Sequence, residues 1–177
     1  MTPALCRGAR NLLGWTIEEL ASMSGVGIST ITSFEGVQRT PIRANLDALA
    51  RALAEGGAIF LDANEDGRGV RLNKTAEALR DILLIAGFPG TDEYRMRRAT
   101  QRIQGFYADA LKYYSDFYGT GKNAEQDVRL RVKSDMQKLR DRVDWEIERR
   151  RRLGRDDAAT RLLEPVTDYI HGQKWGG

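Results

Sequence analysis

The sequence from Thr16 to Gly36, TIEELASMSGVGISTITSFEG, contains the signals for two short helices separated by a turn. Thr16 is a good N-cap, and the two glutamates that follow it suit the positive end of a helix dipole. Gly25 can adopt the positive φ that ends a helix. A second helix is expected from about Gly27 to Phe34, with small hydroxyl side chains outward. Because a second helix of this kind fits a DNA major groove, the stretch predicts sequence-specific DNA binding.

At these residues the chain resembles the lambda repressor/Cro-like (XRE) family of helix-turn-helix transcription regulators. The resemblance covers roughly residues 4–72. The matching segments are CRGARNLLGWT (Cys6 to Thr16), ELASMSGV (Glu19 to Val26), STITSFE (Ser29 to Glu35), TPIRANLDALARAL (Thr40 to Leu53) and GAIFLDANEDGRGVRL (Gly57 to Leu72). The last of these is similar to a segment that often follows the domain in bacterial members. The resemblance implies a DNA-binding domain that reads paired half-sites as a dimer.

Three positions depart from the family pattern. Ile17 stands where the family usually has a glutamine that grips a phosphate and braces the recognition helix. The family tends to have Glu-x-Gly after that helix, whereas this chain has Glu35-Gly36 directly. The recognition helix begins Gly27-Ile28 in place of a polar pair. These departures concern affinity and target sequence, and they leave the expected fold unchanged.

The helix geometry and the resemblance together assign candidate DNA contacts. The candidate base contacts are Ile28, Ser29, Thr32 and Ser33. The candidate phosphate contacts are Arg7, Arg10, Thr16, Thr30, Gln38, Arg39, Thr40 and Arg43. Hydroxyl groups can pair with base edges, and an isoleucine can contact a thymine methyl group. The expected partner is double-stranded DNA, bound by two copies about one helical turn apart on a near-palindromic operator.

Net charge is distributed unevenly along the chain. Residues 1–72 hold seven arginines, no lysine and eight acidic residues, whereas residues 73–177 carry an excess of four positive charges. DNA-binding domains usually carry their own basic surface. The arginines of the run from Arg149 to Arg152 (Arg149, Arg150, Arg151 and Arg152) are therefore candidate auxiliary phosphate contacts. The alternative is a solvated helix end, since arginines suit a helix C-terminus without any further function.

Composition limits the other classes of function. One cysteine, Cys6, excludes an internal disulfide and a cysteine-cluster zinc site. Asp62, Asn64 and Asp66 are spaced like a calcium loop, but its terminal ligand position is Asn73, so a solvated turn is favoured. No phosphate loop, HExxH or Ser-His-Asp pattern stands out. We expect no catalysis, cofactor or metal.

The sequence contains no membrane-length apolar run and no signal-peptide core. We therefore expect a cytoplasmic, nucleoid-associated protein of bacterial or phage type.

The remaining pattern predicts a mainly α fold with a short β-hairpin. After the helix-turn-helix domain (1–58) we expect a hairpin or connector (59–72) and an all-helical domain (73–177). The expected strands are 59–61 and 70–72. The expected helices are 43–55, 75–86, 91–118, 124–152 and 157–171, the last kinked at Pro165 and followed by a frayed Gly-rich tail. The helices 91–118 and 124–152 should form a long antiparallel hairpin because their connection is short.

These two long helices carry apolar side chains at steps of three and four residues, the spacing of a bundle or coiled-coil seam. The seam residues are Ile103, Phe106, Tyr113, Phe117, Val132, Met136, Leu139 and Val143. They could complete a bundle within one chain or form half of a four-helix homodimer, and dimerisation is preferred. The alternative function is a protein-interaction adaptor or antitoxin-like regulator whose main partner is a toxin, RNA polymerase or another regulatory protein. A ligand-responsive regulator would need a pocket among the helices.

Overall fold

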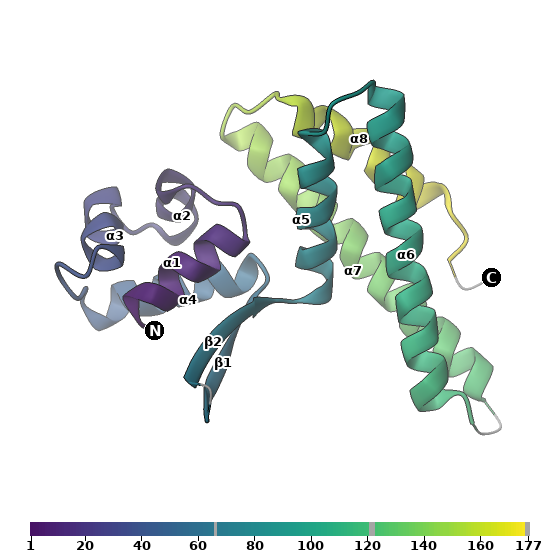
Figure 1. Cartoon of the computed structure of the whole chain (residues 1–177), viewed down its shortest axis with the longest axis horizontal. Coiled ribbons are helices and arrows are strands. Elements are labelled where there is room, and N and C mark those ends of the chain that lie inside the picture. Colours follow the sequence, from purple (N-terminus) through teal and green to yellow (C-terminus); the bar gives the residue numbers. More distant parts are fainter. Residues whose placement is uncertain (66, 121–122, 176–177) are drawn as a thin grey trace. The chain divides into compact units, whose positions relative to one another are not determined.

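A computed structural model of the chain describes residues 1–65, 67–120 and 123–175. Within them it contains eight helices and one two-stranded antiparallel sheet, so the fold is mainly helical, as predicted (Figure 1). The chain divides into two compact units, Met1–Ala76 and Glu77–Gly177, which we describe in turn. Asp66 of the calcium-like turn lies outside the described residues, as do part of the connection between the two long helices and the last two residues of the Gly-rich tail.

Four helices build most of the first unit, and local sequence sets their ends. They are α1 (Pro3–Leu12), α2 (Ile17–Ser24), α3 (Ile28–Glu35) and α4 (Arg43–Glu55). Thr16 caps α2 in a capping box: its hydroxyl accepts from the Glu19 N–H at 3.2 Å, and its own N–H donates to the Glu19 carboxylate at 2.7 Å. Gly25 ends α2 with φ of 69°. The predicted helix, turn and helix of residues 16–36 are therefore present in the fold.

The core of this unit is closed by a tryptophan lying on a glycine. Trp15 is buried, and a Cβ atom added to Gly56 would lie 2.7 Å from its ring. Because real Cβ atoms do not approach so closely, the end of α4 requires glycine at this point. Leu20, Ile31 and Phe34 fill the space between α2, α3 and the remaining helices, each with at most 1% of its surface exposed.

The β-hairpin consists of β1 (Ala58–Asn64) and β2 (Gly67–Leu72), which are longer than the predicted strands 59–61 and 70–72. The register pairs Ala58 with Leu72 and Phe60 with Val70, with an irregularity between Leu61 and Asn64. A lone hairpin buries too little apolar surface to be stable. Here it packs on α1 and α4 and belongs to the first unit, which ends within the first turn of α5 (Lys74–Ala86).

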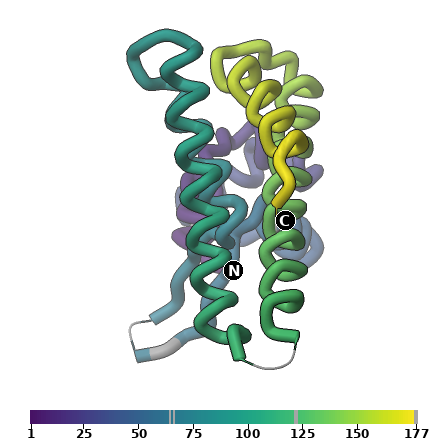
Figure 2. Tube along the Cα trace, turned by 90° about the vertical axis from the view of Figure 1, so that its right-hand side faces the viewer, coloured from purple at the N-terminus to yellow at the C-terminus, as the bar shows by residue number. Residues whose placement is uncertain are grey.

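The second unit is a helical bundle completed within one chain. The helices α6 (Asp92–Tyr118) and α7 (Ala124–Arg152) form the predicted antiparallel hairpin, and α8 (Ala158–Gly172) packs against both, as Figure 2 shows. Thr91 caps α6, its hydroxyl accepting from the Tyr94 N–H at 3.2 Å. One apolar core joins all four helices, with α5 contributing Leu79 and Ile82. Helix α8 continues through Pro165 without interruption.

Six of the eight predicted seam residues lie in this core. They are Ile103, Phe106, Val132, Met136, Leu139 and Val143. Tyr113 and Phe117 lie outside this core, and their side chains are 44% and 68% exposed. They continue the same stripe of α6, but they lie beyond the part of it that takes part in the core. The six core residues are therefore satisfied within one chain, and a dimer would need a different surface.

The segment after α8 is not a frayed tail, at least as far as Trp175. Its indole N–H donates to the carbonyl oxygen of Ile170 at 2.8 Å. Its ring packs against Tyr107, with ring centroids 5.0 Å apart, and against Tyr169 at 6.3 Å. Contacts of one large, partly buried aromatic ring therefore hold the segment up to Trp175, and the glycines that follow it in the predicted frayed tail lie outside the described residues. No helix in the described parts of the chain is both long and apolar enough to cross a membrane.

Candidate nucleic-acid interface

Helix α3 has one buried face and one exposed face, as a recognition helix requires. Ile31 and Phe34 face the core, whereas Ile28, Ser29 and Thr32 are exposed. Ser33 is half-buried at the edge between the two faces. The Thr32 hydroxyl donates to the backbone carbonyl of Ile28 at 2.9 Å, which leaves its oxygen lone pairs directed away from the helix as acceptors. The four candidate base-contact residues thus lie on the outer part of one short helix.

The end of α3 is a Schellman motif with valine at the left-handed position. The N–H of Gln38 donates to the carbonyl of Ser33 at 2.8 Å, and the N–H of Val37 donates to that of Phe34 at 3.0 Å. Val37 has φ of 61°, whereas Gly36 has φ of −80°, which any residue can adopt. Glycine normally occupies the left-handed position because a Cβ atom is strained there. The glycine of this turn therefore stands one residue before the position that needs it.

Beside this turn lies a hollow of about 280 Å³ lined by hydroxyl and amide side chains. It brings together five of the candidate contact residues, Ser29, Thr30, Ser33, Arg39 and Thr40. The rest of its lining comes from the start of α4 and the residues before it: Pro41, Ile42 and Asn45. No acidic residue lines the hollow within the described chain. Sequence reasoning missed Asn45, since only the packing of α4 against the preceding loop brings it to this surface.

Two helix N-termini lie at this hollow, and neither has a side-chain cap. Helix α3 begins after Gly27 and α4 after Ile42, neither N-cap residue makes a side-chain hydrogen bond, and neither first turn contains an acidic residue. By contrast, α1, α2, α6 and α8 each have a side-chain cap. Backbone N–H groups at an uncapped N-terminus favour an anion such as a phosphate.

The surface around the hollow is apolar in places and locally basic. Ile28, Val37 and Ile42 are among the exposed large apolar side chains, at 49%, 76% and 70%. Gln38, Arg39 and Arg43 are also exposed in the segment between α3 and α4 and at the start of α4, and Arg7 is exposed on α1. Arg43 approaches Asp47 at 3.5 Å, but both side chains are largely in water, where such a pair is weak. The first unit is therefore close to neutral overall, although its surface is basic along this edge.

Arg10, a candidate phosphate contact, forms its hydrogen bonds with other residues of the first unit. Its guanidinium binds both carboxylate oxygens of Glu35, at 2.9 Å and 2.7 Å, and donates to the carbonyl of Trp15 at 2.8 Å. Arg7 donates to the backbone carbonyl of Glu35 at 3.4 Å. Burial, together with the neighbouring Glu35 carboxylate, raises the pKa of the Cys6 thiol to about 12. This cluster ties α1 to the end of α3.

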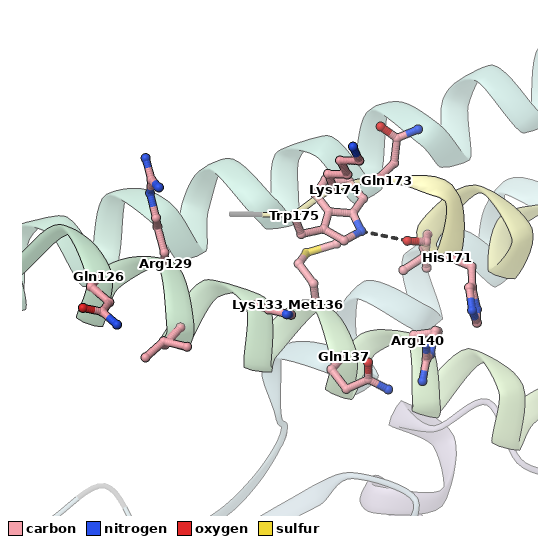
Figure 3. A pocket seen from close by; sticks show the side chains of 12 residues that line it. Gln126, Arg129, Lys133, Met136, Gln137, Arg140, His171, Gln173, Lys174 and Trp175 are labelled. Atoms are coloured by element: carbon pink, nitrogen blue, oxygen red, sulfur yellow. Dashed lines mark hydrogen bonds between the residues drawn. The ribbon is translucent and has the colours of Figure 1, made fainter. Parts of the chain in front are cut away.

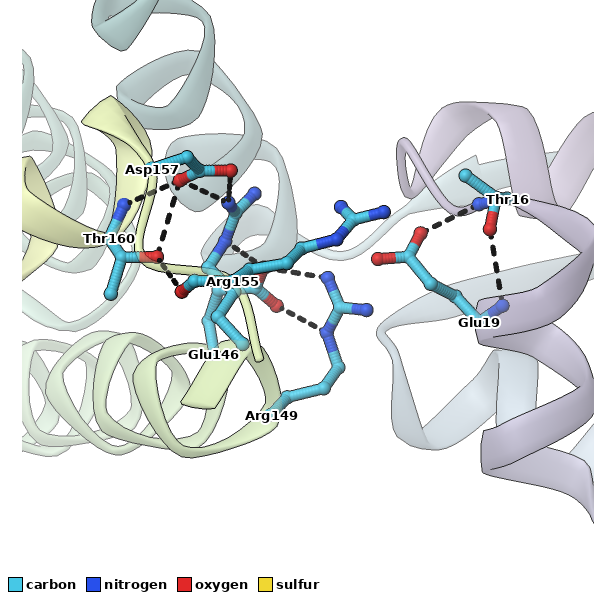
Figure 4. Close-up of polar contacts among 8 residues, drawn as sticks. Thr16, Glu19, Glu146, Arg149, Arg155, Asp157 and Thr160 are labelled. Atoms are coloured by element: carbon cyan, nitrogen blue, oxygen red, sulfur yellow. Dashed lines mark hydrogen bonds and ion pairs between the residues drawn. The ribbon is translucent and has the colours of Figure 1, made fainter. Parts of the chain in front are cut away.

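The hydroxyl and the N–H of Thr16, another candidate phosphate contact, also form hydrogen bonds within the unit. Figure 4 shows its hydroxyl and N–H both paired with Glu19 in the capping box. Hydrogen bonds to its own N–H and to the Thr16 side chain lower the pKa of the neighbouring Glu18 carboxyl. Two carboxylates therefore share the N-terminus of α2, and they would repel a phosphate.

In the second unit, all four arginines of the run from Arg149 to Arg152 form ion pairs. The buried Glu146 carboxylate accepts from Arg149 at 2.7 Å and from Arg150 at 2.8 Å, as part of the polar cluster in Figure 4. Arg150 also reaches Asp157, the residue that caps α8. Arg151 and Arg152 pair with Glu164 and Glu148 on the exposed surface. The run thus joins the end of α7 to α8.

Among the described residues, no group of three or more histidine, cysteine, aspartate or glutamate side chains is placed to hold a metal ion. In comparisons with known proteins, no family model matches the chain. No curated protein matches it either.

Proposed function

We propose that the first unit binds double-stranded DNA with sequence specificity and that the protein regulates transcription. The observation that carries the proposal is the hollow beside α3, in which five candidate contact residues meet two uncapped helix N-termini. Hydroxyl groups, an arginine and free backbone N–H groups, with no carboxylate among the described lining residues, suit a phosphate of the DNA backbone. The adjoining exposed face of α3 would then lie along the base edges of the major groove.

In this proposal the contact residues have distinct roles. Ile28, Ser29 and Thr32 face the bases, with Ser33 at the edge of that face. Thr30, Arg39 and Thr40 hold the phosphate at the hollow, and Gln38, Arg43 and Arg7 contact the flanking backbone. Arg10 and Thr16 act indirectly, because one anchors the end of α3 and the other caps α2. Arg151 and Arg152 are the auxiliary candidates, since their ion pairs are exposed and weak.

We further propose that the protein acts as a homodimer on a near-palindromic operator. The exposed Tyr113 and Phe117 support this, because their rings pack together at 4.9 Å and continue the apolar stripe of α6 outside the core. Exposed apolar surface of this kind often marks a protein interface. Sedimentation velocity at micromolar concentration tests this step. We expect a dimer for the wild-type chain and a monomer for the variant F117R, whereas a monomeric wild-type chain would exclude dimerisation through this surface.

Selection of bound sequences from a random pool of DNA duplexes tests the central proposal. We expect enrichment of one half-site, repeated in inverted orientation about one helical turn apart. Enrichment of single half-sites would support DNA reading and contradict the dimer. Recovery of unenriched DNA would contradict sequence-specific binding.

The second candidate function is a protein-interaction adaptor or antitoxin-like regulator. It is favoured by the net acidic composition of residues 1–72 and by the exposure of Val37 and Ile42 at the same surface. Binding to a random duplex at low salt separates the two functions. A DNA reader binds it and loses affinity steeply as salt rises, whereas an adaptor does not bind.

A further inference from the structure

A cavity of about 570 Å³ lies on the second unit, between α7 and the segment that follows α8 (Figure 3). Its lining residues all belong to residues 126–175, so this unit forms the cavity by itself. The volume is within the range of small-molecule sites, roughly 300–1,000 Å³. No residue discussed for DNA binding lines it.

One wall of the cavity is apolar and held in place. It is made by Trp175 with Met136, Leu130 and Ile170. The hydrogen bond from the Trp175 indole to the Ile170 carbonyl sets the orientation of the ring. Contacts with Tyr107 and Tyr169 support the ring from the bundle side. A flat apolar group could therefore stack on this wall without first ordering it.

The other side chains of the cavity are strongly biased towards positive charge. Arg129, Lys133, Arg140 and Lys174 line it, together with His171, and none of its described lining residues is acidic. Neither Lys133 nor Lys174 has an ion-pair partner among the described residues, and both are labelled in Figure 3 among the side chains that line the cavity. Arg129 is held by Glu125 on the same helix at 2.8 Å.

Arg140 has unused hydrogen-bonding capacity. Its Nη2 atom lies 3.4 Å from the Asp141 carboxylate, but its Nε atom is buried without a hydrogen-bond acceptor, and the Asp144 carboxylate is 4.0 Å from it. Four cations around one hollow repel one another, and an unpaired buried N–H is costly. An anion within the cavity would relieve the repulsion between the cations.

We propose that this cavity binds a small organic anion with a flat apolar body, such as an aromatic carboxylate or sulfonate. The apolar body lies on Trp175 and Met136, while the anionic group pairs with Lys133 and Lys174. The charge of the lining selects against cations. The two lysines, which have no ion-pair partner within the part of the chain that the structure describes, favour an anion over a neutral molecule of the same shape. The site is independent of the DNA surface proposed above.

Fluorescence titration of the full chain with 8-anilinonaphthalene-1-sulfonate tests the proposal. The neutral probe N-phenyl-1-naphthylamine has the same rings without the sulfonate, so it isolates the contribution of charge. We expect saturable one-to-one binding of the anionic probe and at least tenfold weaker binding of the neutral one. Equal affinities, or no saturable binding of the anionic probe, would overturn the proposal.

Two variants and a control locate the site. K133E should weaken the anionic probe about tenfold or more, the effect of replacing a charge-assisted contact by a repulsion, and leave the neutral probe unchanged. K112E makes the same charge change at an exposed position on α6 outside the cavity and should leave both affinities within twofold. W175A should weaken both probes. Equal losses in K133E and K112E, or unchanged binding in W175A, would contradict the assignment, provided that circular dichroism shows each variant folded.

Discussion

Arg10 and Glu35, 25 residues apart, form a two-pronged ion pair that joins α1 to the last turn of α3. The side chains are only 12% and 5% exposed, so water contributes little to their solvation. Arg10 also donates to the Trp15 carbonyl, and Arg7 to that of Glu35. The position of α3, and with it the proposed base-reading surface, therefore depends on a charge cluster behind the helix.

Removal of one partner of this pair should be strongly destabilising. Glu35→Leu leaves the Arg10 guanidinium buried with its main acceptor gone, and Arg10→Met does the same to the carboxylate. We expect each to lower the free energy of unfolding by about 3 kcal/mol, and the double variant to lose clearly less than the sum. Chemical denaturation of the four proteins measures this cycle. Asp47→Ala, which breaks the exposed pair with Arg43, is the control and should cost under about 0.5 kcal/mol. Additive losses would show that the two side chains act separately.

Val37 stores backbone strain that glycine would relieve. A β-branched residue at φ of 61° suffers repulsion from its Cβ atom, worth about 1–2 kcal/mol, and its exposed side chain contributes little burial in return. Val37→Gly should therefore raise the free energy of unfolding by about 0.5–1 kcal/mol, after the greater freedom of glycine in the unfolded chain is subtracted.

Val37→Ala is the matched control for this strain. Alanine keeps the Cβ atom, so it should recover less than half of the gain measured for glycine. Thermal and urea unfolding of the three proteins provide the comparison. If alanine and glycine stabilise equally, the valine side chain, and not the left-handed backbone, is the source of the effect.

Cys6 should be unreactive in the folded protein at neutral pH. Burial and the nearby Glu35 carboxylate raise the pKa of its thiol to about 12, so the thiolate fraction at pH 8 is about a thousandfold below that of an ordinary cysteine. We expect an aromatic disulfide reagent to modify Cys6 on the timescale of unfolding, and at once in denaturant. Rapid modification of the native protein would contradict the burial of this group.

The same pKa makes the stability of the first unit depend on pH in a defined direction. A raised folded pKa favours the protonated thiol, so the stability it contributes is fully present below the unfolded value, near pH 8.5, and is lost as pH rises towards 12. Between pH 8 and pH 10 we expect the wild-type chain to lose about 1–2 kcal/mol more than Cys6→Ala. Parallel pH profiles for the two proteins would argue against this linkage.

The boundaries of the helices were largely predictable because capping is local. The predicted ranges 43–55 and 124–152 agree with α4 and α7, and the predicted range 91–118 agrees with α6 and its N-cap Thr91. The ends of the hairpin strands were less accurate, because strand length depends on the partner strand and on the helices beneath it. The period of α6 predicted an apolar stripe. It could not show where the core of a single chain ends along the helix, so it did not separate the exposed Tyr113 and Phe117 from the buried residues of the same stripe.

Sequence spacing predicted which candidate contact residues lie on one helix, but it did not predict which residues of other elements lie beside them. Sequence spacing places Ser29, Thr32 and Ser33 on α3, whereas Asn45 reaches the hollow only through tertiary packing. Glu35 follows the buried Phe34 and lies one turn after the buried Ile31, and an acid on an apolar face is a signal for a buried partner. Nothing local identifies that partner as Arg10. Packing of Trp175 likewise depends on rings from other turns of the bundle, which is why composition alone predicted a frayed tail.

Substitutions at the hollow should separate base reading from phosphate binding. Arg39 lines the hollow, is exposed, and has no ion-pair partner among the described residues, so Arg39→Ala should weaken binding to all duplexes alike. The slope of log affinity against log salt should fall by about one, the loss of one phosphate contact. Ser29→Ala and Thr32→Ala should instead leave the salt slope unchanged and reduce discrimination at particular base pairs, by about 1 kcal/mol each.

Arg51→Ala is the control for a general loss of charge, because Arg51 is exposed on α4 about two turns after Arg43. Quantitative gel-shift titrations over a range of salt measure all four variants against the selected operator and a scrambled duplex. Unchanged base selectivity in both hydroxyl variants would place the reading surface elsewhere, and an equal salt effect in Arg51→Ala would reduce Arg39 to a contributor of net charge.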